Sequence, residues 1–246
     1  MNNLLNYEPP NDHFLNRVIL ITGANRGIGR SLAKALLHYG ATVVLHGRDL
    51  KALNSVVNES CYDKKNYSLE ILDLKSTDKR LYENFTNQIL KKYGKLDGVV
   101  HNAGILGERK TIENYNADIW NNVLQVNLNS VFMLTKELLP LLHHSSDPSM
   151  IFTTSGVGNC GRAKWGAYSV SKFGVEGLAQ TLADELKNTT IRVNYIDPGA
   201  TRTDMRKKAY PDEDPNKLPS PDEILSLYLY LLGPDSTGIT GHRMKV

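Results

Sequence analysis

A tyrosine and a lysine stand four positions apart at Tyr168 and Lys172, near the start of a helical pattern. Residues at this spacing lie on one face of a helix, so we expect the ammonium of Lys172 near the phenol of Tyr168. A nearby positive charge favours the ionised phenol, and should lower its pKa by a unit or more from about 10. The pair therefore predicts a group that gives and takes a proton near neutral pH.

Ser155 adds a third group to this pair. It lies thirteen residues before Tyr168, directly after an apolar stretch that predicts a strand over residues 150–154. A hydroxyl at that strand end can bond a substrate oxygen that the phenol also contacts. The spacing of tyrosine and lysine alone is common by chance, and the serine makes the combination informative.

Asn127 is a polar residue on an otherwise apolar helix face. The other residues of that face are Trp120, Leu124, Val131, Leu134 and Leu138. An unbonded buried amide would cost roughly 1–3 kcal/mol, so Asn127 needs a partner. We expect it to hold an ordered water in line with Lys172, through which protons would reach solvent. The alternative is a core asparagine that satisfies a neighbouring carbonyl.

A glycine-rich turn follows the first predicted strand and leads directly into a helix. Glycine lets the backbone turn tightly and approach a pyrophosphate, whose charge the amides and dipole of a helix N-terminus favour. The flanking strand and helix make the motif specific. We predict a dinucleotide cofactor, bound here by Gly23, Asn25, Arg26, Gly27, Ile28 and Gly29.

The end of the second predicted strand indicates which cofactor binds. Gly47 stands where an NAD enzyme usually places an acid for the ribose 2′-hydroxyl. Arg48 comes next and Arg26 can reach the same place, and arginine accommodates a 2′-phosphate. We therefore favour NADP(H) over NAD(H). In the alternative, Arg48 is a solvated residue beside the helix cap Asp49, and Arg26 is a surface charge.

Short apolar strands alternate with helical patterns along the chain. Strands are predicted at residues 17–22, 41–46, 67–72, 98–101, 150–154 and 191–196, and helices at residues 28–39, 77–93, about 117–142 and 165–187. Several strands are apolar on both faces, as in parallel sheets covered by helices on each side. The pattern predicts one α/β domain over residues 1–246, a Rossmann-type doubly wound parallel sheet of about seven strands. In its second helix, Leu81, Phe85 and Ile89 should form the buried stripe.

Two segments lie outside this alternation. Residues 1–16 form an N-terminal extension, without the apolar core of a signal peptide. A proline-rich, charged insertion at residues 209–221 follows the sixth strand, on the side where doubly wound sheets bind ligands. We expect a substrate lid over about residues 200–222; a plain surface excursion is the alternative.

Composition excludes several classes of function. The 246 residues carry 29 basic and 26 acidic side chains, and the lysine pairs are scattered among acids, so nucleic-acid binding has no support. The longest uncharged helical stretch, residues 119–135, holds too many amide side chains for a membrane helix. Only Cys61 and Cys160 are present, without metal-like spacing. We therefore expect no metal and a cytoplasmic, reducing location.

Taken together, these motifs resemble the single-domain form of the short-chain dehydrogenase/reductase family, over almost the whole chain. The family's T-G-x-x-x-G-x-G motif corresponds to residues 22–29, and its N-A-G motif to Asn102, Ala103 and Gly104. His101 replaces the more usual preceding asparagine. The family's catalytic tetrad falls on Asn127, Ser155, Tyr168 and Lys172. More narrowly, residues 97–107, 161–172 and 201–206 resemble the YciK-type oxidoreductases of bacteria.

The resemblance implies further contacts. Asp73, followed by Leu74, is similar to the residue that contacts the adenine, and Tyr168 and Lys172 would also contact the cofactor. The nicotinamide carboxamide would be held by Pro198, Gly199, Thr201 and Thr203. The helices at residues 117–142 and 165–187 form the interface in relatives, which implies a homo-dimer or homo-tetramer.

We therefore expect an NADP(H)-dependent oxidoreductase that transfers hydride between nicotinamide and a small-molecule carbonyl or secondary alcohol, with Tyr168 as acid and base. One alternative is an NADP(H)-binding redox sensor without turnover. Another is a 3-oxoacyl carrier-protein reductase, although the D-G-G ending common in those enzymes is absent from residues 240–246. A metal-dependent alcohol dehydrogenase lacks a suitable Cys/His set.

The basic residues around the expected substrate opening leave its preference open. They are Arg162, Lys164, Arg202, Arg206, Lys207 and Lys208, with Trp165 as a stacking wall. They could attract an anionic or carrier-linked ligand. The alternative is solvated charge, balanced by the acids at residues 212–214.

Overall fold

The structure is a computed structural model that describes residues 4–58 and 66–246, so Cys61 lies outside the described residues. In this part of the chain seven strands form one sheet in the order β3-β2-β1-β4-β5-β6-β7, and every neighbouring pair is parallel. The strands are β1 (Val18–Thr22), β2 (Thr42–Gly47), β3 (Tyr67–Ile71), β4 (Gly98–His101), β5 (Ser149–Thr153), β6 (Arg192–Asp197) and β7 (Arg243–Lys245). The predicted doubly wound α/β fold is confirmed.

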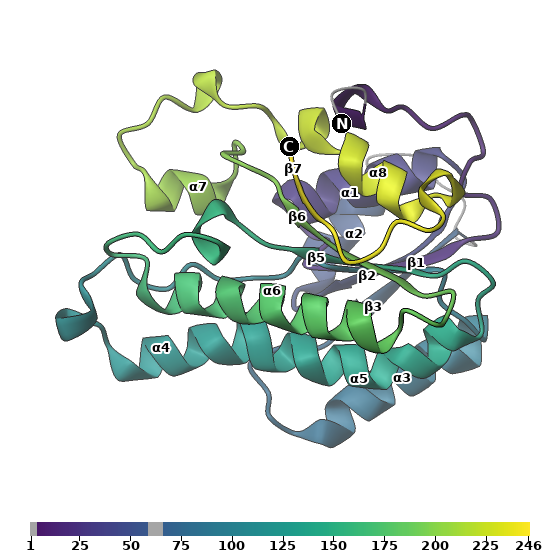
Figure 1. The fold of residues 1–246 in the computed structure, drawn as a ribbon, viewed down its shortest axis with the longest axis horizontal. Coiled ribbons are helices and arrows are strands. Elements are labelled where there is room, and N and C mark those ends of the chain that lie inside the picture. The colour runs from purple at the N-terminus through teal and green to yellow at the C-terminus, as the bar shows by residue number, and fades with distance from the viewer. Residues whose placement is uncertain (1–3, 59–65) are drawn as a thin grey trace.

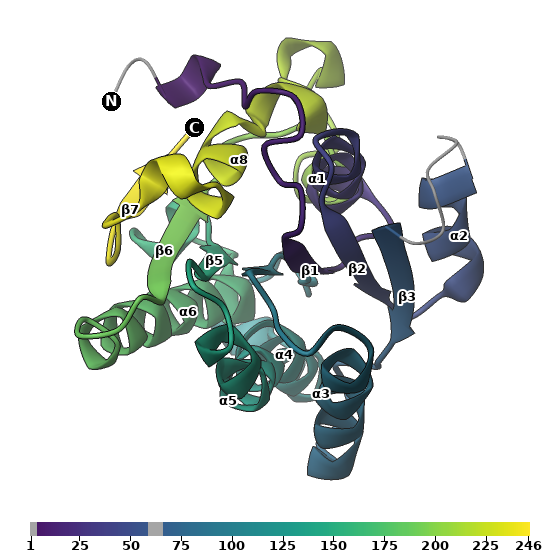
Figure 2. The same ribbon diagram turned by 90° about the vertical axis from the view of Figure 1, so that its right-hand side faces the viewer.

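Helices cover both faces of the sheet (Figures 1 and 2). One face packs against α1 (Gly27–His38), α2 (Leu50–Asn58) and α8 (Ser226–Leu232). The other packs against α3 (Lys79–Tyr93), α5 (Ser130–His143) and α6 (Gly166–Glu185), and α4 (Ala117–Leu124) lies against α6. Successive strand residues alternate between the two cores, so Ile19 faces one and Leu20 the other. This is why the central strands are apolar on both faces.

The predicted helices at residues 28–39 and 77–93 are α1 and α3. Gly94 ends α3 in the left-handed conformation, with φ of 72°, as the glycine signal predicts. The predicted buried stripe of α3 is wrong at one position, because Leu81 is 43% exposed and Tyr82 is 1% exposed. The buried face is Tyr82, Phe85, Thr86 and Ile89, which is the i, i+3, i+4, i+7 pattern of one helix face.

The helix predicted over residues 117–142 is interrupted. A π-helical turn, Gln125–Asn129, separates α4 from α5. Such turns are rare and are often found at functional sites. This one contains Asn127, so the irregularity lies at a predicted site residue.

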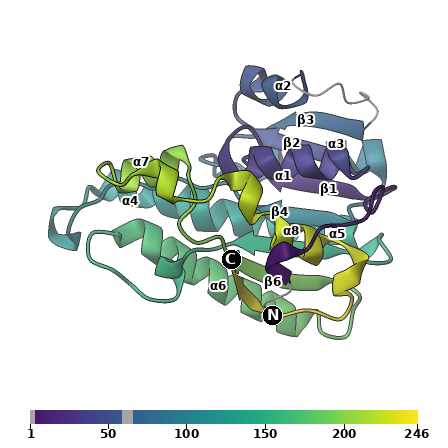
Figure 3. The same ribbon diagram turned by 90° about the horizontal axis from the view of Figure 1, so that it is seen from above.

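The order of the strands places a crevice at one end of the sheet. The chain runs outwards from β1 through β2 to β3 and then crosses back to β4 on the other side of β1, so the strand order reverses between β1 and β4. Ligands bind beyond the carboxyl ends of the strands at such a point. The short helix α7 (Asp204–Ala209) follows β6 and lies at the same end of the molecule as α4 (Figure 3). Among the described residues, none of the helices has the length and apolar character needed to cross a bilayer.

Candidate active site

One pocket runs along the carboxyl ends of the strands, from the turn after β1 to α7. Its wall includes nearly all of the sequence-predicted site residues, namely Gly23, Asn25, Arg26, Gly27, Ile28, Arg48, Asp73, Leu74, Asn102, Ala103, Gly104, Ser155, Tyr168, Lys172, Pro198, Gly199, Thr201 and Thr203. Gly29 and Asn127 do not line the pocket. Both lie behind the wall and pack against residues that do line it.

The glycine turn has little room for side chains. A Cβ at Gly29 would lie 2.6 Å from the side-chain nitrogen of Asn102, and closer still to the carbonyl oxygen of Gly23. Gly23 itself has φ of +68°, and its Cβ would lie 3.0 Å from the Cα of Ala103. The turn and the Asn-Ala-Gly segment can therefore approach each other only because these positions are glycines.

Thr22 joins these two segments. Its hydroxyl accepts hydrogen bonds from the amides of Asn102 and Ala103, at 2.9 and 3.0 Å. The side chain of Asn102 donates to the carbonyl of Thr22 at 3.0 Å. Because β1 and β4 are neighbours, their carboxyl ends form one rigid floor for the pocket.

The residues at this end of the pocket fit a dinucleotide. No side chain caps α1, whose N-cap is Arg26, so its first amides face the glycine turn without a side-chain partner. Arg26 and Arg48 both line the pocket beside these amides. Asp49 accepts hydrogen bonds from the amides of Lys51 and Ala52, and caps α2 as expected. A pyrophosphate at the turn and a phosphate beside the arginines would each meet positive charge.

Ser155 and Tyr168 both line the other end of the pocket, close enough for the serine hydroxyl to act on the pKa of the phenol. Lys172 is buried on the same face of α6, with its nitrogen 5.7 Å from the centre of the Tyr168 ring. That nitrogen donates a hydrogen bond of 2.7 Å to the carbonyl of Thr153. The structure thus brings the three residues together from the end of β5 and the start of α6.

The expected lowering of the Tyr168 pKa is not found. Burial raises the pKa of Tyr168 to about 12; the hydroxyl of Ser155 acts in the opposite direction, and the charge of Asp197 adds to the rise. Burial also lowers the pKa of Lys172 to about 8, against the charge of Glu176. The prediction from spacing alone was wrong because it ignored the desolvation of both groups.

The amide of Asn127 has protein partners on all sides. Its oxygen accepts from the amide of Ile105 at 2.8 Å, and its nitrogen donates to the Ile105 carbonyl at 2.9 Å and to the hydroxyl of Ser171 at 3.1 Å. Both amide protons are used, so the side chain has no donor left for the expected water. Asn127 joins the π-helical turn to α6 and to the segment after Gly104, as in the alternative of a core asparagine.

A buried ionic network lies behind this end of the pocket. Arg243 of β7 donates to both oxygens of Glu176, at 3.1 and 3.3 Å, and to Asp197 at 3.2 Å. Its Nη2 also donates to the carbonyl of Ser155 at 3.2 Å. Glu176 accepts a further hydrogen bond of 2.6 Å from the hydroxyl of Thr154. One arginine thus joins the last strand to α6, to β6 and to the segment that carries the serine.

Sequence reasoning missed part of the site. The pocket wall also contains Leu106, and the network contains Arg243. Met205 and Ala209 of the expected lid line the pocket as well, although neither was singled out. The segment after the N-A-G motif was a usable signal for Leu106. Arg243 had no such signal, since one arginine in a polar C-terminal stretch resembles a surface residue.

Comparisons with known proteins agree with this geometry. The short chain dehydrogenase family profile matches residues 17–214. The oxidoreductase YciK of Escherichia coli K12 is 46% identical over 240 residues, covering 96% of this chain and 94% of that protein.

Two solved structures with 44% identity and TM-scores of 0.92 each cover 96% of this chain and 99% of their own. One is a short chain dehydrogenase from Shigella flexneri complexed with NADP. The other is a short chain dehydrogenase from Escherichia coli CFT073 complexed with NADPH. By family profile, sequence and structure, the chain belongs to the short-chain dehydrogenase/reductase family.

Proposed function

We propose that the protein is an NADP(H)-dependent carbonyl reductase and alcohol dehydrogenase whose proton donor and acceptor is Tyr168. The observation that carries this proposal is the meeting of Tyr168, Ser155 and Lys172 in the same pocket as the glycine turn. Residues that can move a proton and residues that fit a dinucleotide form one continuous wall.

The cofactor assignment rests on the two arginines at the dinucleotide end. Arg26 and Arg48 line the pocket, and Gly47 leaves no carboxylate to repel a 2′-phosphate. The two similar structures bound to NADP and NADPH support the same choice. When bound, the cofactor supplies hydride to the carbonyl carbon, or accepts it from the alcohol.

The residues of this chain handle the oxygen and its proton. Ser155 donates a hydrogen bond to the substrate oxygen, and Tyr168 donates the proton that turns the reduced carbonyl into an alcohol. Lys172 binds the nicotinamide ribose and, when protonated, offsets the negative charge left on the phenol. Asn127 holds the Ile105 segment and α6 in register.

The Tyr168→Phe variant tests this assignment. It should lower kcat for NADPH-dependent reduction of a verified ketone roughly 10²- to 10⁴-fold, because the proton donor is removed. Its thermal stabilisation by NADPH should be retained. Normal turnover by the variant would refute the role of Tyr168. If the wild-type protein binds both NADP⁺ and NADPH but reduces nothing in a broad carbonyl panel, the redox sensor is the better explanation.

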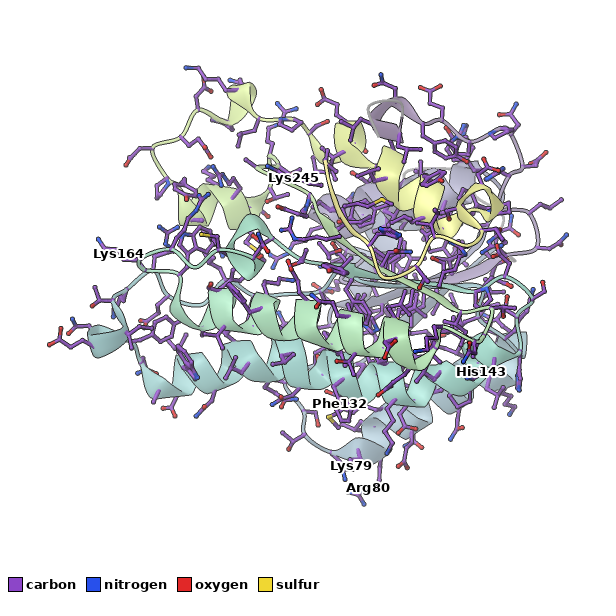
Figure 4. All side chains as sticks on the ribbon, viewed as in Figure 1. Lys79, Arg80, Phe132, His143, Lys164 and Lys245 are labelled. Carbon is purple, nitrogen blue, oxygen red and sulfur yellow. The ribbon has the colours of Figure 1, made fainter. Side chains whose placement is uncertain are left out.

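We also propose that the protein is a homo-oligomer built on its long helices. Phe132 on α5 and Phe173 and Val170 on α6 are 53%, 46% and 46% exposed. Figure 4 shows Phe132 on the outer side of the helix layer. Exposed apolar groups on adjacent helices favour a second copy of the chain as partner. Light scattering of the wild-type protein should give a multiple of the monomer mass of 27.5 kDa. The Phe173→Lys variant should have a lower mass, closer to that of the monomer.

A further inference from the structure

Five side chains at the lid end of the pocket form a row in which aromatic rings alternate with guanidinium groups and a carboxylate stands last: Trp165, Arg109, Tyr210, Arg206 and Glu213. We call them the lid ladder. The guanidinium carbon of Arg109 lies 4.2 Å from the centre of the Trp165 ring and 5.1 Å from that of Tyr210. The guanidinium carbon of Arg206 lies 4.0 Å from the Tyr210 ring. Glu213 accepts two hydrogen bonds of 2.6 Å from Arg206. Each step is attractive, because a cation is drawn to an aromatic face and to a carboxylate.

The lid ladder ties three distant segments together. Arg109 follows β4, Trp165 immediately precedes α6, and the other members lie in and after α7. Arg109 also donates a hydrogen bond of 3.3 Å to the carbonyl of Ala209, the last residue of α7. The Trp165 ring lies 5.5 Å from that of Tyr168. The ladder therefore fixes α7 next to the proposed proton donor.

An apolar cluster forms part of the pocket wall at the lid end, beside the polar lid residues Thr203, Asp204 and Arg206. Leu106, Trp165, Met205 and Ala209 all line the pocket, and they pack in one cluster with Tyr168. Leu106, Trp165 and Ala209 are each less than 10% exposed. A flat hydrocarbon group placed here would lose water contacts and gain the face of the Trp165 ring.

The charges on the pocket wall at this end do not favour an anion. Arg109 has no ion-pair partner among the described residues, but it lies behind the wall, stacked on Trp165 and Tyr210, and the wall itself carries the carboxylate of Asp204. Four cations line the pocket: Arg26 and Arg48 at the dinucleotide end, Lys172 beside Tyr168, and Arg206 at the lid. Arg206 is already paired with Glu213 through two hydrogen bonds and is stacked on Tyr210. A buried carboxylate of the substrate would need a cation that has no other partner.

The remaining cations near the opening are on the outside. Arg162, Lys164, Arg202, Lys207 and Lys208 are exposed and do not line the pocket. Figure 4 shows Lys164 at the edge of the molecule, directed outwards. Of the basic residues predicted to surround the opening, only Arg206 reaches the pocket wall, and its charge is neutralised there.

We infer that the lid ladder makes the site specific for uncharged carbonyl compounds with a flat apolar substituent, and that Glu213 sets this preference by occupying Arg206. This inference rests on the proposed function, because it assigns a substrate class to the same site. A substrate with a carboxylate on that substituent would bind more weakly, since its charge would lie against the apolar cluster and near Asp204, while Arg206 is already paired with Glu213.

Binding can be measured without turnover. The sequence contains two tryptophans, Trp120 and Trp165, so the Trp120→Phe variant reports on the ladder alone through the fluorescence of Trp165. With saturating NADP⁺, acetophenone should quench this fluorescence with a dissociation constant at least tenfold below that of 4-acetylbenzoate. Equal or tighter binding of the carboxylate would overturn the inference, and so would the absence of binding by either ketone.

The Glu213→Gln variant tests the assigned residue. A glutamine at this position cannot form the ion pair, so the charge of Arg206 becomes available to the carboxylate of 4-acetylbenzoate. The ratio of the two dissociation constants, which measures the preference for acetophenone, should fall at least tenfold. Asp212→Asn is the matched control, because it removes an exposed carboxylate from the same loop without releasing Arg206. The same change of preference in both variants, or in neither, would overturn the role of Glu213.

Reduction of the two ketones with NADPH separates this inference from the proposed function. If acetophenone binds preferentially but is never reduced, the proposed reaction fails and the binding preference stands. If both ketones are reduced with equal kcat/KM, the reaction stands and the inference fails.

Discussion

Arg243 donates a hydrogen bond of 3.2 Å from its guanidinium to the backbone carbonyl of Ser155, although the two residues are 88 positions apart. The same guanidinium pairs with Glu176 and Asp197, two carboxylates that are almost fully buried. The last strand thereby supports the serine at the proposed active site from behind.

The Arg243→Met variant should therefore be strongly destabilised. Removing the cation leaves two buried carboxylates without a counter-charge, and breaking such a pair costs about 3 kcal/mol or more. The Arg243→Lys variant keeps the positive charge and should lose less stability than Arg243→Met. Urea denaturation gives the free energy of unfolding, and Lys245→Met, at an exposed site in the same strand, is the control. A loss below about 1 kcal/mol in Arg243→Met would contradict the importance of the network.

Arg48 should discriminate between the two nicotinamide cofactors. A charge-assisted hydrogen bond contributes about 1.5–3 kcal/mol, so Arg48→Ala should weaken NADPH binding roughly tenfold or more and change NADH binding little. Calorimetric titration of both cofactors measures this. Lys51→Ala, at an exposed position of α2 outside the pocket wall, should leave both affinities unchanged. Tighter binding of NADH than NADPH by the wild-type protein would refute the assignment.

Two buried histidines should make stability depend on pH. Burial lowers the pKa of His46 to about 4 and that of His101 to about 3. Below pH 6.5 the unfolded chain binds protons that the folded chain does not, so the contribution of the two neutral histidines to the free energy of unfolding is fully present above that pH and is lost as the pH falls towards 4. From pH 7 to pH 5.5 the free energy of unfolding should therefore fall by about 2.5 kcal/mol for the two residues together.

Urea denaturation at both pH values tests this dependence. His101→Asn should remove about half of the loss, whereas His143→Asn, at an exposed position, should retain all of it. Stability that is the same at pH 7 and 5.5 in the wild-type protein would show that the imidazoles are not held neutral by burial.

Asn127→Ala should lower both stability and activity. The change leaves the amide and carbonyl of Ile105 without their partner, which costs about 3 kcal/mol in total. Because the Ile105 segment follows the pocket residue Gly104, kcat should also fall. The control is Asn129→Ala, an exposed asparagine in the same π-helical turn. An active Asn127→Ala protein of normal stability would show that the amide is dispensable.

Local rules were sufficient for most of the fold. The alternation of β-branched strands and capped helices predicts the parallel sheet and the approximate ends of α1, α3 and α6, because periodicity and glycine caps act within a few residues. The same holds for the glycine turn and for the spacing of Tyr168 and Lys172. Even so, Leu81 was assigned to the buried face of α3 in place of Tyr82, because the helical phase was set by packing against the sheet. The helices α2 and α8 and the break between α4 and α5 were not predicted.

The properties that depend on distant partners were decided by the tertiary structure. Neither the direction of the Tyr168 pKa shift nor the partners of Asn127 follow from spacing, since burial and the position of Ile105 determine them. The pairing of Arg206 with Glu213 offsets the charge of the one predicted basic residue that reaches the pocket wall. The sequence determined which chemical groups are present and which of them follow each strand or share a helix, because those are short-range matters. Their charge state and their hydrogen-bond partners were set by long-range packing, which removes water and brings remote residues into contact.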